Sequence, residues 1–165
     1  HLDNVSETGA APAMETVDLL DVARECVERQ KVNARRSYIS LTYLGESAPV
    51  TGSRVLLDEL CQNLCDNAIR YNRPGGKVQI ITACTRDGHC TLTVKDNGIG
   101  IPKEAQTSVF ERFYRVDKSR SKATGGTGLG LAIVKHIARI HNARIKLDSV
   151  VDEGTTITVI FETAS

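Results

Sequence analysis

Seven residues, Gly125-Gly-Thr-Gly-Leu-Gly-Leu131, carry four glycines and stand directly before a helical pattern. Such a run offers flexible backbone N–H groups and the positive end of a helix, which together favour a polyphosphate. Two familiar phosphate loops are excluded by Leu131. A dinucleotide fingerprint that starts at Gly126 needs glycine at that position, and a Walker loop that starts at Gly125 needs lysine there. The glycines therefore predict a different nucleotide-binding fold.

Hydrophobic periodicity and turn residues divide the rest of the chain into alternating elements. Helices are predicted at 16–35, 53–72 with Ser53 as cap, 103–114 and 127–141, a polar loop at 115–126, and strands at 38–44, 77–85, 90–95, 143–151 and 155–162. Helices that segregate from strands favour an α/β two-layer sandwich, in which about three helices cover one face of a mixed, mostly antiparallel sheet. We expect residues 1–15 to be a linker or the end of a preceding helical hairpin domain, and 16–165 to be one domain.

Composition excludes several classes of partner. The 21 basic and 20 acidic residues nearly cancel, so no overall field favours nucleic acid or an anionic membrane. No apolar run approaches the length of about 18 residues that a transmembrane helix needs. The five cysteines show no paired CxxC spacing, and we expect all of them to be buried free thiols in a reducing cytosol.

The predicted helix at 53–72 carries a polar stripe beside its apolar face. At about 100° per residue, Glu59, Asn63, Asn67 and Arg70 fall within roughly 80° of one another. An amide oxygen is a neutral, hard ligand that suits Mg²⁺ when the ion also keeps waters and phosphate oxygens. A solvated helix face explains the same stripe equally well.

A second polar constellation follows the predicted strand at 90–95. Asp96 ends the strand and is followed by Gly98 and Gly100. A carboxylate there can accept a hydrogen bond from an exocyclic amine such as that of adenine, while the glycines let a ring approach the backbone. An Asp-Asn-Gly triplet is also a common turn, so this segment alone is ambiguous.

In their order along the chain, these segments resemble the conserved boxes of the GHKL superfamily, and more narrowly the catalytic domain of histidine kinases. The resemblance runs from about Thr16 onward and implies a Bergerat-type ATP-binding fold. The matching segments are the asparagine box Glu59–Tyr71, the first glycine box Asp96–Gly100, the phenylalanine box Val109–Arg115, the second glycine box Gly126–Leu131, and a closing Gly154-Thr155.

The resemblance assigns roles to individual residues. Asn67 would ligate Mg²⁺ with support from Asn63, and Asp96 would hold the adenine amine of ATP. Phe110 and Phe113 would anchor an ATP lid at 115–126. The other implied nucleotide contacts are Arg70, Arg115, Arg120 and Lys118 for phosphate, Tyr71, Gly98, Gly100 and Ile101 around adenine, Gly126, Gly128, Leu129, Gly130 and Leu131 in the phosphate loop, and Thr155 through bound water.

The resemblance implies a protein-histidine kinase that binds Mg-ATP, and one position separates it from the ATP-hydrolysing relatives. Those relatives carry a general-base glutamate four residues before the metal asparagine, where this chain has Asn63, and an amide cannot take a proton near pH 7. The alternatives are a GHKL-family ATPase, an anti-sigma-type serine kinase and a non-catalytic nucleotide-sensing module.

The resemblance also implies partners. None of the four histidines has the acceptor context of the family, so the phosphate acceptor would lie on a dimerisation and histidine phosphotransfer domain outside this chain. A response regulator would then receive the phosphate. We expect a monomeric, cytoplasmic domain of a membrane-anchored bacterial sensor kinase.

Overall fold

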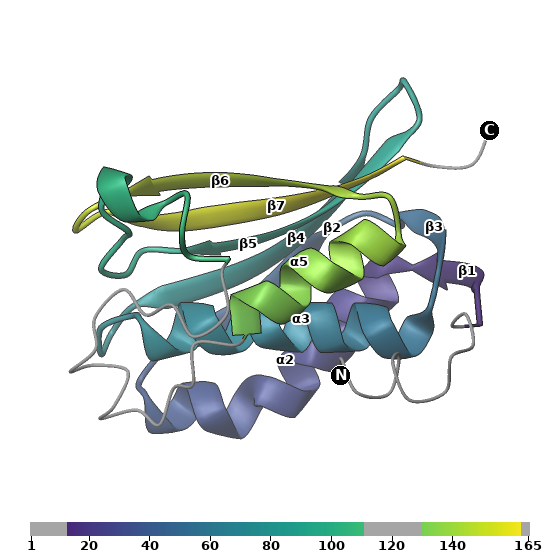
Figure 1. Ribbon diagram of the computed structural model, residues 1–165. Helices are drawn as coiled ribbons and strands as arrows, with labels where there is room; N and C mark the ends of the chain where they lie inside the picture. Colours follow the sequence, from purple (N-terminus) through teal and green to yellow (C-terminus); the bar gives the residue numbers. More distant parts are fainter. Residues whose placement is uncertain (1–12, 111–129, 163–165) are drawn as a thin grey trace.

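The computed structural model describes residues 13–110 and 130–162. A five-stranded sheet in the order β2-β4-β5-β7-β6 is covered on one face by three helices, as Figure 1 shows. Only the β2–β4 pair is parallel, so the predicted mixed, mostly antiparallel sandwich is confirmed. The bounds are β2 Ser40–Gly45, β4 Lys77–Cys84, β5 His89–Asp96, β7 Gly154–Glu162 and β6 Arg144–Val150, with helices α2 Leu19–Arg36, α3 Arg54–Arg70 and α5 Gly130–Ile140.

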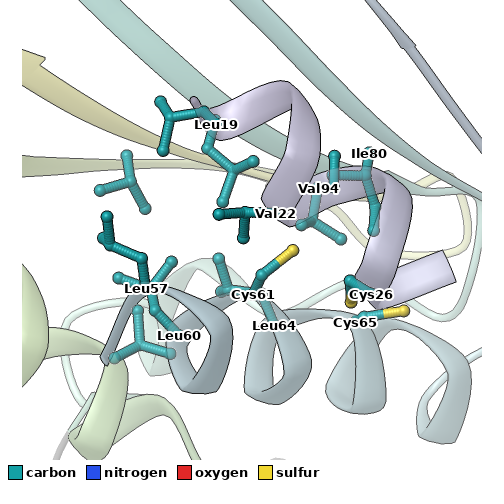
Figure 2. Packing of buried hydrophobic residues seen from close by; sticks show 14 of the residues in the cluster. Leu19, Val22, Cys26, Leu57, Leu60, Cys61, Leu64, Cys65, Ile80 and Val94 are labelled. Carbon is teal, nitrogen blue, oxygen red and sulfur yellow. The ribbon is translucent and has the colours of Figure 1, made fainter. Parts of the chain in front are cut away.

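The core lies between the helices and the inner face of the sheet. Along β5 and β7 every second residue is buried, which is the period expected of strands with one covered face. Val94 of β5 and Ile80 of β4 belong to the same buried cluster as Leu60 and Leu64 of α3, and Figure 2 shows part of this cluster between the helices and the sheet. The apolar face of α3 therefore packs in the core, and its polar stripe lies at the margin of the core.

The first helix begins later than the sequence predicts. Glu15–Asp18 form strand β1, which pairs antiparallel with β3, Pro49–Gly52. Asp18 then caps α2, because its Oδ1 accepts hydrogen bonds from the backbone N–H of Leu20 at 3.0 Å and of Ala48 at 2.8 Å. The prediction of helix from residue 16 was wrong because a strand partner distant in sequence outweighs local periodicity.

The second helix follows its prediction closely. Ser53 is its N-cap, with Oγ accepting from the backbone N–H of Leu56 at 3.3 Å. The helix ends at Arg70, just before the Arg73-Pro-Gly-Gly76 segment that was expected to stop it. Both ends of the element that carries the asparagine box are thus fixed by local sequence signals.

The expectation that all five cysteines are free thiols was wrong for two of them. Cys84 and Cys90 form a disulfide across the β4–β5 hairpin, where the register places them directly opposite each other. Cys26, Cys61 and Cys65 are buried and free, as predicted, and Figure 2 shows them where α2 faces α3. Residue spacing alone does not reveal strand register, which is why the pair was missed.

The predicted helix at 103–114 differs from the structure, and the predicted loop at 115–126 lies outside the described residues. In place of a helix from 103, the structure has a short 3-10 helix, η1, at Lys103–Ala105, followed by turns up to Phe110. Residues 111–129 lie outside the described part, and with them the predicted lid and Phe113, Arg115, Lys118, Arg120, Gly126, Gly128 and Leu129. Within the described ranges, no helix is long and apolar enough to cross a membrane.

Candidate nucleotide-binding site

The two asparagines of the α3 stripe are held in one orientation by their own helix. Asn63 donates from Nδ2 to the backbone carbonyl of Glu59 at 2.9 Å, and Asn67 donates to the carbonyl of Asn63 at 3.0 Å. Each bond engages the amide nitrogen with the backbone one turn earlier. The acceptor Oδ1 of each side chain is therefore the atom that remains for a cation or another ligand.

Arg70 is engaged with a neighbour on α3. Its Nη2 lies 2.8 Å from Oδ2 of Asp66, one turn earlier, and Asp66 also accepts from Nδ2 of Asn33 on α2 at 3.4 Å. Arg70 and Asp66 line a cavity of about 470 Å³ between the carboxyl ends of α2 and α3, together with Arg36. A phosphate contact by Arg70 stays a prediction, and the guanidinium has further N–H donors besides those on Nη2.

Asp96 is the most perturbed carboxyl group of the site. Its Oδ1 accepts from the backbone N–H of Gly98 at 2.9 Å and of Thr155 at 3.2 Å. Burial raises the pKa of Asp96 to about 6, although both backbone donors act in the opposite direction. Because Oδ1 takes both backbone donors, Oδ2 can serve an amine of a ligand.

Two glycines of the first glycine box are required by the protein's own backbone. A Cβ on Gly98 would lie 2.5 Å from the carbonyl oxygen of Tyr71. Gly100 has a φ of +74°, and a Cβ there would lie 2.2 Å from the carbonyl oxygen of Val150. The structure thus adds a second reason for these glycines besides the predicted approach of a ring: the loop is sandwiched between the end of α3 and the β6–β7 turn.

Sequence reasoning missed a residue behind this loop. Ser149 of β6 accepts from the backbone N–H of Ile101 at 2.7 Å and shares a hydrogen bond of 2.8 Å with the hydroxyl of Thr155. Thr155 is buried and contacts Asp96 through its backbone. A serine on a strand gives no signal in sequence, because only the β6–β7 register brings it beside Thr155.

The structure brings the described site residues to one end of the molecule. The backbone N–H of Ile99 donates to the carbonyl of Tyr71 at 3.2 Å, which ties the glycine loop to the end of α3. Leu131, at the start of α5, packs against a small cluster that contains Ile101 and Val109. In Figure 1 the carboxyl end of α3 and the amino end of α5 accordingly lie toward the same side as the end of β5.

Comparison with known proteins identifies the family of the chain. Residues 52–165 match the family of histidine kinase-, DNA gyrase B- and HSP90-like ATPases, and the chain belongs to that family. Among the relatives that it matches are sensor histidine kinases.

The sensor-like histidine kinase SenX3 of Mycolicibacterium smegmatis is 49% identical over 153 residues, which are 90% of this chain and 38% of that protein. The solved structure of the mycobacterial sensor histidine kinase MprB has a TM-score of 0.77 at 33% identity and covers 90% of this chain and 97% of its own. The catalytic domain of ThkA has a TM-score of 0.79 at 22% identity, which supports the fold. The chain spans about a third of the length of its curated relatives.

Proposed function

We propose that this chain binds Mg-ATP and donates the γ-phosphate to a histidine on a separate dimerisation and phosphotransfer domain. One observation carries the choice of kinase over hydrolase. Position 63 holds an amide whose nitrogen is bonded to the carbonyl of Glu59, so the stripe offers no base there to deprotonate water. The γ-phosphate then remains available to an imidazole nucleophile, because phosphoryl transfer depends chiefly on positioning and charge neutralisation.

The described residues support specific contacts to the nucleotide. Oδ2 of Asp96 would accept from the adenine amine, and Tyr71 would pack on the ring. Thr155 would act through a water, while its backbone fixes Asp96. Leu131 and the start of α5 would border the phosphates, where the amino end of a helix favours negative charge.

The donor set of the stripe fits Mg²⁺. Among the described residues, no group of three histidine, cysteine or acidic side chains could hold a metal ion by itself. Asn67 Oδ1, supported by Asn63, would therefore act with phosphate oxygens, which is how Mg²⁺ is commonly bound beside nucleotides. When bound, the ion would neutralise charge on the phosphates. The protein's own contribution is to hold the amide oxygen in place through the bond from Asn67 Nδ2 to the carbonyl of Asn63.

The described histidines do not supply an acceptor. His141 is buried, with both ring nitrogens hydrogen-bonded to backbone groups. His89 stands at the opposite end of β5 from Asp96, about 23 Å away at 3.3 Å per residue. His136 lies about 9 Å along α5 from its amino end at Gly130. We therefore place the acceptor on a helical hairpin outside this chain, and a response regulator downstream of it. We also propose that the chain is a monomeric, cytoplasmic part of a membrane-anchored sensor.

A transfer assay tests the proposal. The chain is incubated with γ-labelled ATP, Mg²⁺ and a separately purified hairpin that carries the acceptor histidine. We expect acid-labile label on the hairpin, and none with the Asn67→Ala chain. Release of free phosphate without label would favour the ATPase alternative, acid-stable label would favour a serine kinase, and tight binding without either would favour a nucleotide-sensing module.

A further inference from the structure

One buried hydrogen bond joins the two helices that border the proposed nucleotide site. The backbone N–H of Ser53, the N-cap of α3, donates to Nε2 of His141 at 3.0 Å. His141 immediately follows the last residue of α5 and lies 88 residues away in sequence. Its other ring nitrogen, Nδ1, lies 2.8 Å from the carbonyl oxygen of Ile137. Because that carbonyl can only accept, Nδ1 carries the proton, and Nε2 is free to accept from Ser53.

The imidazole replaces a local cap. The N–H of an N-cap residue is commonly bonded by a glutamate or glutamine three residues later, but this position in α3 is Leu56. Ser53 is only 5% exposed, so without His141 its N–H would be buried and unsatisfied. A histidine from the end of another helix thus completes the amino end of the asparagine-box helix.

The surroundings hold the ring in this one position. A Cβ on Gly52 would lie 2.8 Å from Cδ2 and 2.9 Å from Nε2 of His141, so only glycine leaves the ring its place. The ring of Phe161 stands edge-on to the imidazole, with centroids 6.2 Å apart. Burial also lowers the pKa of His141, which favours the neutral ring that this arrangement needs.

The hydrogen bond between Ser53 and His141 lies where a small change can alter the spacing of α3 and α5 at the proposed nucleotide site. Figure 1 shows α3 and α5 running in opposite directions, so the bond joins them at the end away from the nucleotide residues. Asn67 lies about 21 Å along α3 from Ser53, and Gly130 lies about 16 Å along α5 from His141. A small rotation at the joined end therefore changes the separation between the asparagines and the amino end of α5.

We propose that His141 is a positioning residue: its hydrogen bond to Ser53 sets how far the start of α5 stands from Asn63 and Asn67, and thereby tunes affinity for Mg-ATP. The inference rests on the proposed function. It assigns His141 no contact with the nucleotide, since the residue lies at the far end of α5.

Two substitutions at one position separate the bond from the bulk of the ring. His141→Gln places an acceptor near the former Nε2 and keeps the bond to Ser53. His141→Asn keeps a donor toward Ile137 but cannot reach Ser53. Under conditions where thermal melting shows each variant more than 95% folded, we expect the Asn variant to bind Mg-ATP about fivefold more weakly and the Gln variant within about twofold of the parent, since one net hydrogen bond is at stake. Val78→Ala, in the core of β4, is the control that lowers stability without touching the bond.

A third variant, at Gly52, tests the hydrogen bond between Ser53 and His141 by moving the imidazole ring. Gly52→Ala should displace the ring and weaken Mg-ATP binding to the same degree, and the double variant with His141→Asn should be no weaker than either single one. Parent-like affinity of the folded Asn variant, or an equal loss in Gln and Asn, overturns the proposal.

A ligand-free measurement separates this proposal from the proposed function. In proton NMR of the empty chain, the Asn variant should lose protection of the Ser53 amide and change the cross-peaks between α3 and α5, whereas the Gln variant should keep both. Unchanged cross-peaks in the Asn variant contradict a positioning role for His141. If the two variants show these NMR effects but the parent chain does not bind Mg-ATP, the proposed function is rejected instead.

Discussion

At the scale of single residues, the site holds a group that weakens the fold. Asp96 is half-buried with a pKa raised to about 6, so above this pH the folded chain carries a charge that water would solvate better. Two backbone N–H groups reduce this cost without removing it. The amine of a ligand could donate to Oδ2 of Asp96, because both backbone N–H groups bond to Oδ1.

Replacing Asp96 by asparagine should therefore separate stability from function. The amide oxygen can still accept from Gly98 and Thr155, but the amide presents a donor to the adenine amine, and we expect ATP affinity to fall more than tenfold, by about 1.5–3 kcal/mol. At pH 8 the free energy of unfolding should rise by about 1–3 kcal/mol, because the charged group is gone.

The titration of Asp96 should also make the free energy of unfolding depend on pH. The folded pKa of about 6 exceeds the ordinary value of 3.8, so the folded parent binds the extra proton in this window and loses stability as pH rises through it. The stability advantage of the Asn variant should therefore shrink from pH 8 toward pH 4. Denaturant unfolding at both pH values and calorimetry with ATP and GTP measure these effects. Equal nucleotide affinity in the variant and the parent would reduce Asp96 to a turn residue.

Asn67 gives the complementary case, in which function is lost and stability is kept. Its side chain lies on the stripe and not on the apolar face of α3, and within the described part of the chain it bonds to the backbone of its own helix. Asn67→Ala should abolish Mg²⁺-dependent ATP binding and change the free energy of unfolding by less than about 1 kcal/mol. Calorimetry with and without Mg²⁺ checks this, with Gln30→Ala on α2 as the control. Undiminished Mg-ATP affinity would remove Asn67 from the metal site.

At the scale of elements, the predicted ends of α3 rest on nearby residues and were confirmed, whereas features that depend on pairing between distant strands were wrong or missing. Ser53 and the Pro-Gly-Gly segment mark the ends of α3 in sequence, and the structure agrees. The start of α2, the Cys84–Cys90 bond and Ser149 beside Thr155 all depend on strand pairings between distant segments, which periodicity does not encode. The segments of the candidate site could be read from contiguous sequence, whereas Ser149 was missed because it meets Thr155 only through the pairing of β6 with β7.

Asp18 stands at the boundary between β1 and α2, and its contribution to stability can be tested. It caps α2 and also accepts from Ala48 and from the hydroxyl of Ser47, so it ties the helix to the segment before β3. Asp18→Ala should lower the free energy of unfolding by about 1–2 kcal/mol, whereas Asp18→Asn, which can still cap, should cost less.

Burial raises the pKa of Asp18, but hydrogen bonds from Ser47, Ala48 and Leu20 outweigh it and leave the pKa below 3.8. The contribution of this residue should thus be complete above pH 3.8 and be lost as pH falls through the folded pKa. Urea unfolding at pH 7 and pH 3 measures the difference. A difference between the parent and the Ala variant that persists unchanged at pH 3 would assign the effect to packing.

At the scale of the whole molecule, the chain should bind ATP and keep it intact. His141 is held by backbone groups at both ring nitrogens, and position 63, where the hydrolysis of ATP would need a base, is an amide. After incubation with γ-labelled ATP and Mg²⁺, we expect no acid-labile label on the chain. Addition of a histidine-bearing hairpin should produce label slowly, because a separate molecule lacks the effective concentration of a tether. Stoichiometric acid-labile label on the chain alone would show that an acceptor histidine lies within it.

The pairing of Asp96 with Thr155 across β5 and β7 also bears on how the chain folds. These residues are 59 positions apart, whereas the β4–β5 and β6–β7 hairpins close over a few residues. Contacts between distant segments carry the larger loop-closure entropy and tend to form after local hairpins. The adenine acceptor would then acquire its final geometry only when both hairpins have docked. During refolding, nucleotide binding should appear with the slowest phase, so that ATP selects molecules that have finished folding.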